Sequence, residues 1–255
     1  MLQNQGLIKT NLTTVSSMYF VFDIESIPDI PLLRMLLDDP PESDDVLLDQ
    51  ATEDLGRGKS GFLPPMYHQM VSWVGLWVTD SGEPRQKVAW SGTDERKGVL
   101  ELIDVLSTYK DFGVIHHNGK GFDLPLITYR AMKHGLQLPP RLTAHEIRYR
   151  FSKFNLDLMD EFSNFGASSY PKLKHIGALI GIPVKLTGEG DQVLEMFRKG
   201  ELERIEHYCY EDVMATYLIW LHLQFTSGFL RQNEFRDLRS RALAKLQEIQ
   251  DKTVT

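Results

Sequence analysis

Residues 19–25 read Tyr-Phe-Val-Phe-Asp-Ile-Glu, a short apolar and aromatic run that closes on two carboxylates. A run of this kind is typical of a buried strand. Side chains two positions apart on a strand point to the same face, so Asp23 and Glu25 are predicted to project together. The stretch therefore predicts a central strand with a pair of acidic groups at its end.

Outward from this run, the pattern of apolar residues predicts one α/β domain. The other predicted strands are 69–79, 86–90, 113–117 and 154–157. The predicted helices are 94–109, which Thr93 or Asp94 caps, 122–135, several from residue 172 onward with breaks at 181–183 and 188–190, and 229–252. This order gives a five-stranded sheet flanked by helices.

Composition is that of a globular protein and excludes several classes. Of the 255 residues, 42% are hydrophobic and 25% are charged, as in ordinary globular domains. The net charge of −7 excludes a general attraction to nucleic acid or membranes, so a polyanionic partner needs local basic patches or metal ions. Cys209 is the single cysteine, which excludes an internal disulfide and fits a cytoplasmic location. No apolar run approaches the length of about 18 residues that a membrane span needs.

Charge and composition also suggest how the chain is divided. We expect 1–17 to be a flexible N-terminal arm, 18–226 to be the folded domain, and 227–255 to add a helix packed on it. Residues 1–60 hold 11 acidic and 4 basic side chains. Most of these acidic residues fall in 38–61, which we expect to be a solvated insertion loop.

Three later segments carry further carboxylates. They are 118–123 (NGKGFD) at a strand-to-helix turn, 156–160 (LDLMD) beside the last predicted strand, and 208–212 (YCYED) inside a helix. In the last segment, an i, i+4 spacing puts the tyrosine and the final aspartate on one helix face. For Asp157 and Asp160, a supporting contact to a site and a turn or cap role are equally favoured.

Clustered carboxylates suit two-metal hydrolysis of phosphodiesters. Mg²⁺ prefers hard carboxylate oxygens, and two such ions about 3.5–4 Å apart activate an attacking water and stabilise the leaving oxygen. Carboxylates packed this closely repel one another without metal, which raises their pKa values. An Asp-x-Glu pair is expected about once by chance in such a chain. The prediction therefore depends on the order of the segments: strand end, strand-to-helix turn, late helix.

With these residues in this order, the sequence resembles the DEDD superfamily of 3′–5′ exonucleases, in its tyrosine-containing (DEDDy) subgroup. It is similar in particular to stand-alone proteins related to the exonuclease domain of family-B DNA polymerases. The matching motifs are FDIESIPD at 22–29, HNGKGFD at 117–123 and YCYED at 208–212. Ser26 stands where the family usually has threonine and keeps the hydroxyl. The resemblance implies a ribonuclease-H-like fold with a mixed five-stranded sheet.

The resemblance also implies roles for the matching residues. The expected ligands of two Mg²⁺ or Mn²⁺ ions are the carboxylates of Asp23, Glu25, Asp123 and Asp212. Asp23 would bridge both ions, and Asp123 would bind on the leaving-group side. Tyr208 is expected to orient the attacking water through its hydroxyl. The motif residues expected to contact the substrate are Ser26, Asn118, Lys120 and Phe122.

A basic segment offers a second set of substrate contacts. Residues 130–185 hold 9 basic and 4 acidic side chains. Arg148 and Arg150 stand there beside Tyr149 and Phe151, and a positive groove with stacking aromatics is what a single strand needs. We predict that these arginines bind substrate with an affinity that falls as salt rises. An ordinary solvated face is an equally favoured interpretation.

Other patterns are excluded as sites. LGRGKS at 55–60 ends like a phosphate-binding loop, but Glu53 replaces the required first glycine and no strand precedes it. His207 and Cys209 point to different helix faces and do not make a zinc site. At most one of the adjacent His116 and His117 can face a site from a strand, and a structural histidine is favoured.

The sequence thus predicts a hydrolase that acts at the 3′ end of single-stranded nucleic acid and releases nucleoside 5′-monophosphates, with DNA only weakly favoured over RNA. Two alternatives stay open. One is a nucleic-acid-binding module without catalysis, and the other is a trimming or proofreading subunit that is active only in a larger assembly. The complete carboxylate set argues against the first alternative.

Overall fold

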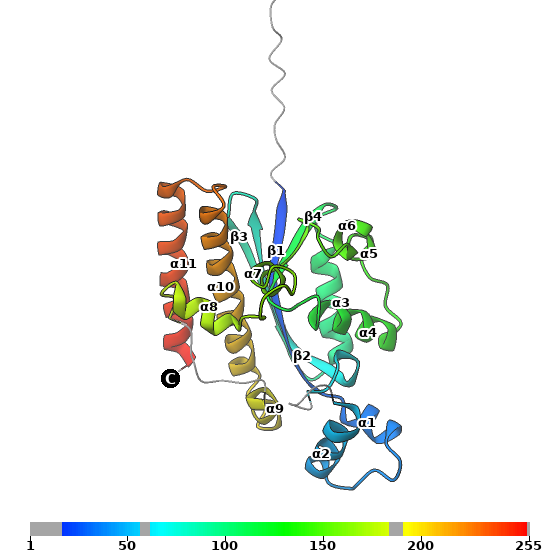
Figure 1. Cartoon of the computed structure of the whole chain (residues 1–255). Coiled ribbons are helices and arrows are strands. Elements are labelled where there is room, and N and C mark those ends of the chain that lie inside the picture. The colour runs from blue at the N-terminus through cyan, green and yellow to red at the C-terminus, as the bar shows by residue number, and fades with distance from the viewer. Residues whose placement is uncertain (1–16, 57–61, 184–190, 254–255) are drawn as a thin grey trace, which may run out of the picture.

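The strand β1 (Met18–Pro28) runs through the middle of the sheet in the computed structural model (Figure 1). The structure describes residues 17–56, 62–183 and 191–253. The other strands are β2 (His68–Thr79), β3 (Pro84–Ser91), β4 (Phe112–His116) and β5 (Asn155–Asp157). The helices are α1 (Ile30–Leu36), α2 (Asp44–Leu55), the 3-10 helix η1 (Pro65–Tyr67), α3 (Glu95–Leu106), α4 (Asp123–His134), α5 (Pro140–Thr143), α6 (His145–Arg148), α7 (Leu158–Phe162), α8 (Leu173–Leu179), α9 (Asp191–Arg198), α10 (Leu202–Thr226) and α11 (Gln232–Thr253).

The sheet is mixed, with the strand order β3-β2-β1-β4-β5. β1 pairs antiparallel with β2 and parallel with β4, while β2 and β3 are antiparallel and β4 and β5 are parallel. The prediction of an α/β fold with a mixed five-stranded sheet is therefore confirmed.

Alternation along β1 explains the two layers of helices. Phe20 and Phe22 are buried with residues of α3 and α4, whereas Val21 is buried with residues of α10 and α11. Figure 1 shows these two helix pairs on opposite sides of the sheet. The Phe20 ring lies across Gly75 of β2, where an added Cβ would come within 1.9 Å of the ring, so only glycine fits there.

The two ends of β1 have different neighbours. β4 pairs with β1 from Met18 to Val21. Past that point the chain leaves β4 through a turn and enters α4, whose first residue is Asp123. The second half of β1 thus has no parallel partner strand in β4. The start of α4 lies beside it instead. This is the edge at which acidic groups from distant segments can meet.

A buried ion-pair network fixes α4 against this edge. Arg130 is 2% exposed and donates to the carboxylates of Asp29 at 2.8 Å and Glu95 at 2.5 Å. Asp29 also accepts from Lys133 at 2.7 Å, and Glu95 accepts from His134 at 2.7 Å. Buried charges need partners of this kind, and the network here ties α4 to α3 and to the end of β1.

The expectation of a loop over 38–61 is wrong for residues 44–55, which form α2. Leu47 and Ala51 of this helix are fully buried against Leu33 of α1. The many acidic residues of this segment favour a solvated loop. However, Leu47 and Ala51, four positions apart, form an apolar helix face that packs against α1.

The C-terminal helix differs slightly from its prediction. α11 begins at Gln232, three residues after the predicted start at Phe229. Gly228, with φ +79°, follows the end of α10. α11 then packs along α10 through Leu238, Ala242 and Leu246. Within the described ranges, no helix combines the length and hydropathy of a bilayer span. The predicted break at 188–190 and most of the predicted N-terminal arm lie outside the described residues.

Candidate active site

Asp23 and Glu25 lie on the half of β1 that β4 does not cover. They pair across the sheet with Val74 and Ser72 of β2. Glu25 is 8% exposed and Asp23 is half-buried. The register shifts after Glu25, and such an irregularity bends a strand and re-aims its side chains. β1 thus places the carboxylates of Asp23 and Glu25 close together, as the sequence predicts.

The helix α10 brings Tyr208, Cys209 and Asp212 across the same strand. Cys209 is fully buried and donates from Sγ to the backbone oxygen of Asp23 at 3.3 Å and to its Oδ2 at 3.6 Å. Burial raises the pKa of the Cys209 thiol well above its usual value, and the charge of Asp23 raises it further. The thiol is therefore neutral, and it acts as a donor that seats α10 on Asp23.

Asp123, the first residue of α4, is contributed by a third element after β1 and α10. It is 5% exposed, and a backbone hydrogen bond from Ile24 of β1 reaches its carboxyl group. Burial, and next the charge of Asp157, raise the pKa of Asp123 to about 7. The structure therefore brings the strand, the strand-to-helix turn and the late helix together, as the sequence predicted.

Burial, and after it the charge of neighbouring carboxylates, raises the pKa values of all four acidic groups. Burial is the main reason for the pKa of about 7 at Asp23, and the charge of Asp123 adds to it. The pKa of Glu25 is raised well above its usual value by burial and then by the charges of Asp23 and Asp212. The pKa of Asp212 is also raised, by burial and then by Asp23. Among the described residues, none of the four forms a salt bridge with a lysine, arginine or histidine.

These donors fit divalent metal ions. One ligand atom from each of Asp23, Glu25 and Cys209 lies within 4.8 Å of the other two. Carboxylate oxygens are the ligands that Mg²⁺ and Mn²⁺ favour. A buried group of acids without counter-charge is costly unless a cation neutralises it, so the cluster is a candidate metal centre.

Tyr208 stands beside this cluster, one helix turn before Asp212. Its side chain is half-buried. Burial, followed by the charges of Asp212 and Glu25, raises its pKa well above the usual value. The phenol therefore keeps its proton throughout the physiological range and can donate a hydrogen bond.

The turn before Asp123 is held from β5. Asn118 has a left-handed φ of +64°. Its N–H donates to Asp157 Oδ1 at 2.8 Å, and the N–H of Lys120 donates to Asp157 Oδ2 at 3.1 Å. His116 is 1% exposed and accepts from the Gly119 N–H at 3.1 Å, so it is a structural histidine. Asp157 thus supports the turn, and the same side chain also caps α7.

Lys120 and Arg150 converge on one further carboxylate. Lys120 Nζ lies 3.3 Å from Asp160 Oδ2, and an Arg150 nitrogen lies 3.1 Å from Asp160 Oδ1. A cavity of about 460 Å³ opens beside them, with Asn118 and Tyr170 among its lining residues. Arg148 lines a neighbouring hollow that also includes Lys120. Asp157 lines the same cavity, so two cations and two carboxylates stand together next to the turn.

Ser26 and Phe122, the remaining predicted contacts, meet at His68. Ser26 Oγ lies 3.1 Å from His68 Nδ1, and the rings of His68 and Phe122 are 5.2 Å apart, edge to face. Phe62 stacks on His68 at 5.4 Å and also lies 5.6 Å from the Phe122 ring. Phe62 and His68 could not be identified from the sequence, because neither stands in a motif and no pattern of spacing relates them to Phe122.

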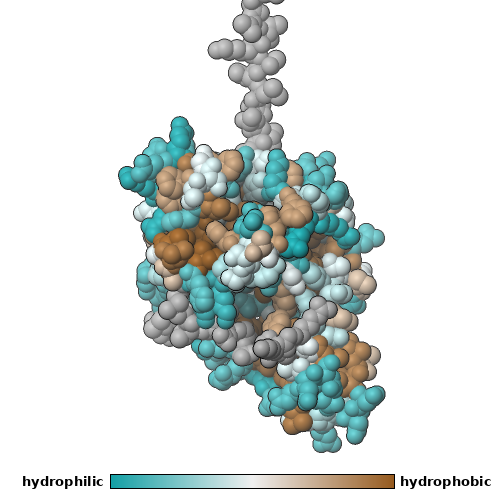
Figure 2. Space-filling model, viewed as in Figure 1, coloured by the Kyte–Doolittle hydropathy of each residue, from teal (hydrophilic) through white to brown (hydrophobic). Residues whose placement is uncertain are grey.

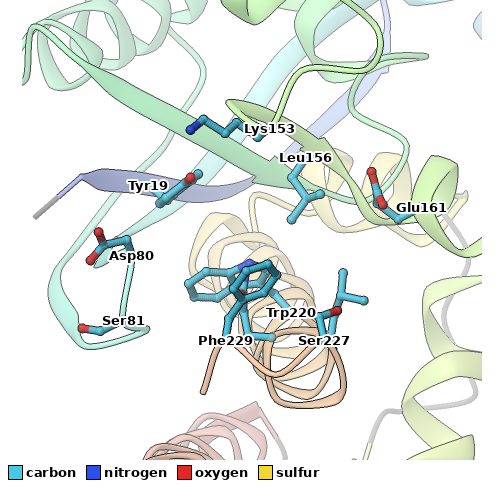
Figure 3. A pocket seen from close by; sticks show the side chains of 11 residues that line it. Tyr19, Asp80, Ser81, Lys153, Leu156, Glu161, Trp220, Ser227 and Phe229 are labelled. Carbon is cyan, nitrogen blue, oxygen red and sulfur yellow. The ribbon is translucent and has the colours of Figure 1, made fainter. Parts of the chain in front are cut away.

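A larger hollow of about 580 Å³ lies elsewhere on α10 (Figure 3). Tyr19, Trp220 and Phe229 line it together with charged residues such as Lys153 and Glu161. Trp220 follows Asp212 by about 12 Å along the helix. No residue predicted for the site lines this hollow, so it is separate from the carboxylate cluster.

A family model matches residues 60–255, and its family is described as a predicted 3′–5′ exonuclease related to the exonuclease domain of PolB. This chain belongs to that family. Asp123, Tyr208 and Asp212 fall inside the matched residues, whereas β1 with Asp23 and Glu25 precedes them. The predicted relationship to family-B polymerase exonuclease domains is therefore confirmed.

Individual relatives match this chain at low sequence identity. A DNA polymerase of Archaeoglobus fulgidus is 23% identical over 133 residues, which are 49% of this chain and 17% of the polymerase. The family B DNA polymerase of the archaeon Pyrobaculum calidifontis matches with a TM-score of 0.52 and 16% identity, over 82% of this chain and 24% of the polymerase. A product-bound exonuclease I gives a TM-score of 0.48 and 12% identity, over 87% of this chain and 45% of its own. The chain thus spans less than half the length of each of these proteins.

Proposed function

We propose that the chain is a metal-dependent 3′–5′ exonuclease that shortens single-stranded nucleic acid by two-metal-ion catalysis. The observation that carries the proposal is the convergence of Asp23, Glu25, Asp123 and Asp212 on one buried spot without a protein counter-charge among the described residues. Single-stranded DNA is the first substrate we propose, with RNA close behind, and the cytoplasm is the proposed location.

We propose that the four carboxylates hold two Mg²⁺ or Mn²⁺ ions. Asp23 would be shared between the ions, with Glu25 and Asp212 on the side of the attacking water and Asp123 on the side of the leaving group. When bound, the ions would activate the water as Lewis acids and neutralise charge on the leaving oxygen. The raised pKa values support this assignment, because a bound cation offsets the burial and the neighbouring negative charges that raise them.

Tyr208 is proposed to orient the attacking water. Because its pKa is raised, the phenol is protonated and can fix the water by a hydrogen bond. The water oxygen bonds to phosphorus and releases one proton to solvent, the bond between phosphorus and the 3′ oxygen of the preceding nucleotide breaks, and that oxygen takes up a proton from solvent. The terminal nucleotide leaves as a nucleoside 5′-monophosphate, and the strand ends in a new 3′-hydroxyl.

The cations Lys120 and Arg150 in this hollow support a contact with the strand backbone. Asp160 holds both cations in place, so less side-chain entropy is lost when they meet a phosphate. Arg148 is exposed next to them and would add a further phosphate contact. Asn118 is proposed to act mainly through the turn it forms.

A gel assay tests the proposed function. Matched single-stranded DNA and RNA, labelled at the 5′ end, are incubated with Mg²⁺, Mn²⁺ or a chelator. The expected result is a metal-dependent ladder that shortens from the 3′ end and is absent in Asp23→Ala and Asp212→Ala. Glu206→Ala, in the same helix but paired with Lys87 away from the cluster, is the matched control and should cut normally.

Other outcomes would favour the alternatives. Folded Asp23→Ala and Asp212→Ala proteins with full metal-dependent activity would contradict the assigned site. If the wild-type chain binds the strand in a salt-sensitive way but cuts neither DNA nor RNA, a binding module or a subunit that needs an assembly becomes the better description.

A further inference from the structure

The turn that follows α7 has an unusual backbone conformation. Asn164, Phe165 and Gly166 have consecutive left-handed φ values of +50°, +55° and +91°. Glycine adopts this region without strain and asparagine is tolerated there, but phenylalanine is rare in it because its Cβ crowds the backbone. Residues held in such conformations persist where the surrounding structure requires them, and they gather at functional sites. The position of Phe165 in this turn therefore needs a reason.

Hydrogen bonds within the turn hold Phe165 against the end of α7. Its N–H donates to the carbonyl oxygen of Asp160 at 2.7 Å. The fully buried Ser163 donates its hydroxyl to the same oxygen at 3.1 Å and accepts from the Gly166 N–H at 3.1 Å. These bonds stabilise the left-handed conformation, and they place Phe165 next to Asp160.

The Phe165 side chain lies against the ammonium group of Lys120. Lys120 Nζ is 5.8 Å from the centroid of the ring, within the range of about 6 Å over which a cation is attracted to an aromatic face. The ring of Phe151 packs on Phe165 edge to face at 4.7 Å and supports it. The carbonyl oxygen of Phe165 also lies 3.4 Å from an Arg150 nitrogen. Phe165 thus contacts both cations that line the cavity beside the turn before Asp123.

The contacts of Lys120 leave one of its donors for a ligand. An ammonium group has three N–H donors. Over the described ranges, protein acceptors take two of them, the carbonyl oxygen of Arg150 at 2.6 Å and Asp160 Oδ2 at 3.3 Å. Lys120 lines the cavity of about 460 Å³, and Phe165 does not. The ring is therefore placed to act on the lysine and not on a ligand in the cavity.

A lysine that is fixed in advance binds an anion better than a mobile one. A mobile lysine side chain loses rotamer freedom when a ligand immobilises it. Lys120, held by two acceptors and a ring, has lost that freedom on folding, so more of its interaction with a phosphate oxygen appears as affinity. Lys120 stands three residues before Asp123, the first residue of α4, so a phosphate bound there lies near the carboxylate cluster.

We propose that Phe165 is a positioning residue that fixes the ammonium group of Lys120 for a phosphate of the bound strand. The proposal rests on the exonuclease function proposed above and gives the strained turn after α7 a part in substrate binding. The left-handed conformation is retained because it places an aromatic ring beside Lys120. Phe165 does not touch the strand, so its effect on binding passes through Lys120.

Two variants separate the ring of Phe165 from its backbone conformation. Phe165→Ala removes the ring and keeps a Cβ in the left-handed region, whereas Phe165→Gly removes both. Phe165→Gly should therefore unfold at a higher urea concentration than Phe165→Ala, the reverse of the order at an ordinary position. Both variants should weaken binding of a 5′-fluorescein-labelled 12-nucleotide single-stranded DNA equally, by about 2- to 5-fold, the range for one exposed cation–π contact. The dissociation constant is measured by anisotropy in chelator, which prevents metal-dependent cleavage.

A double-mutant cycle shows whether the effect passes through Lys120. Lys120→Met keeps an unbranched apolar side chain and removes the charge, so it should weaken binding and lower the dependence of log affinity on log salt by about 1. Combined with Lys120→Met, Phe165→Ala should weaken binding no further. Phe165→Tyr keeps the aromatic face and should retain the wild-type affinity. Phe162→Ala removes a ring that is 38% exposed at the end of α7 and, as the control, should bind normally.

Three results would overturn the positioning role. The first is additive loss of affinity in Phe165→Ala and Lys120→Met. The second is tighter binding by Phe165→Gly than by Phe165→Ala, because binding would then follow stability, as a purely structural role requires. The third is a wild-type chain that binds neither the DNA strand nor its RNA counterpart. Cleavage with Mg²⁺ is measured separately, so coupling without cleavage would reject the proposed exonuclease and keep the positioning role, and cleavage without coupling would do the reverse.

Discussion

The Asp157 carboxylate accepts a hydrogen bond from the backbone N–H of Asn118 at 2.8 Å. Its second oxygen accepts from Lys120 at 3.1 Å, and the first also accepts from Met159 at 3.0 Å, which caps α7. Asp157 is 2% exposed, so these bonds are shielded from water. The three-residue strand β5 thereby positions the turn that ends at Asp123 without placing a group of its own among the four carboxylates.

Replacing Asp157 should therefore impair both stability and catalysis. Asp157→Ala leaves buried N–H groups without their acceptor, which costs about 1–3 kcal/mol in the free energy of unfolding. A shift of the turn misplaces Asp123, and a misplacement of about 1 Å costs about 100-fold in rate. Urea unfolding and kcat measure the two effects. Asp157→Asn keeps an acceptor oxygen and should recover part of both, whereas a folded Asp157→Ala protein with wild-type kcat would contradict this role.

Without metal, the carboxylate cluster should make the protein less stable as pH rises. The pKa values of Asp23 and Asp123 are about 7 in the folded chain and about 3.9 in an unfolded one. Between these values the folded state holds protons that the unfolded state has released, so the free energy of unfolding falls as pH increases from about 4 to 7. His68 and His116, whose pKa values are lowered, act in the opposite direction below about 6.5.

Comparison with Asp23→Asn isolates the carboxylates, because the histidines are common to both proteins. In chelator at pH 8, the variant should unfold at a higher urea concentration than the wild type, and the advantage should shrink at pH 5. Adding Mg²⁺ or Mn²⁺ at pH 8 should stabilise the wild type and not the variant. A variant that is less stable than the wild type at pH 8 in chelator would show that the cluster is not under electrostatic strain.

Removal of the Tyr208 hydroxyl should reduce catalysis and leave metal binding unchanged. In Tyr208→Phe we expect kcat to fall by about 100-fold, within the range for loss of a positioned proton donor or acceptor. Stabilisation by Mg²⁺ or Mn²⁺ should be unchanged, since the protonated phenol is not proposed as a ligand. Tyr210→Phe is the matched control, because Tyr210 is 9% exposed and packs in the core of α10 and α11. Equal loss of activity in both variants would contradict a specific role for Tyr208.

The carboxylate cluster could be predicted because each part of it follows a local rule. A spacing of two on β1 and of four on α10 fixes which side chains share a face, and the order of the segments supplies the rest. The contact of Phe122 with Phe62 and His68 could not be predicted, because these residues meet only through packing between distant segments. The tie between Asp157 and the Asn118 turn is of the same kind, since a side chain reaches backbone groups far from it in sequence.

The α1–α2 hairpin shows where prediction from local composition gives the wrong structure. Its acidic residues satisfied the composition rule for a solvated loop, and α2 does expose most of them. The helix exists because Leu47 and Ala51 find Leu33 across the hairpin, a partner that a window centred on the acidic segment does not contain. Figure 2 shows apolar and polar residues side by side over this part of the surface, which is why hydropathy alone does not identify the helix.

Arg150 and Arg148 test whether the basic segment binds the strand. Asp160 accepts from Arg150 at 3.1 Å, whereas Arg148 is exposed next to the hollow that it lines. Charge reversal at either arginine should weaken binding of a single strand. It should also reduce the dependence of log affinity on log salt by about 1 for each phosphate that the protein no longer neutralises.

Arg236→Glu supplies the control, because it changes the net charge equally from an exposed position on α11. If it weakens binding as much as Arg150→Glu does, the effect is one of overall charge and not of the hollow beside Asn118. If all three reversals leave the affinity and its salt slope unchanged, the basic segment is a solvated face.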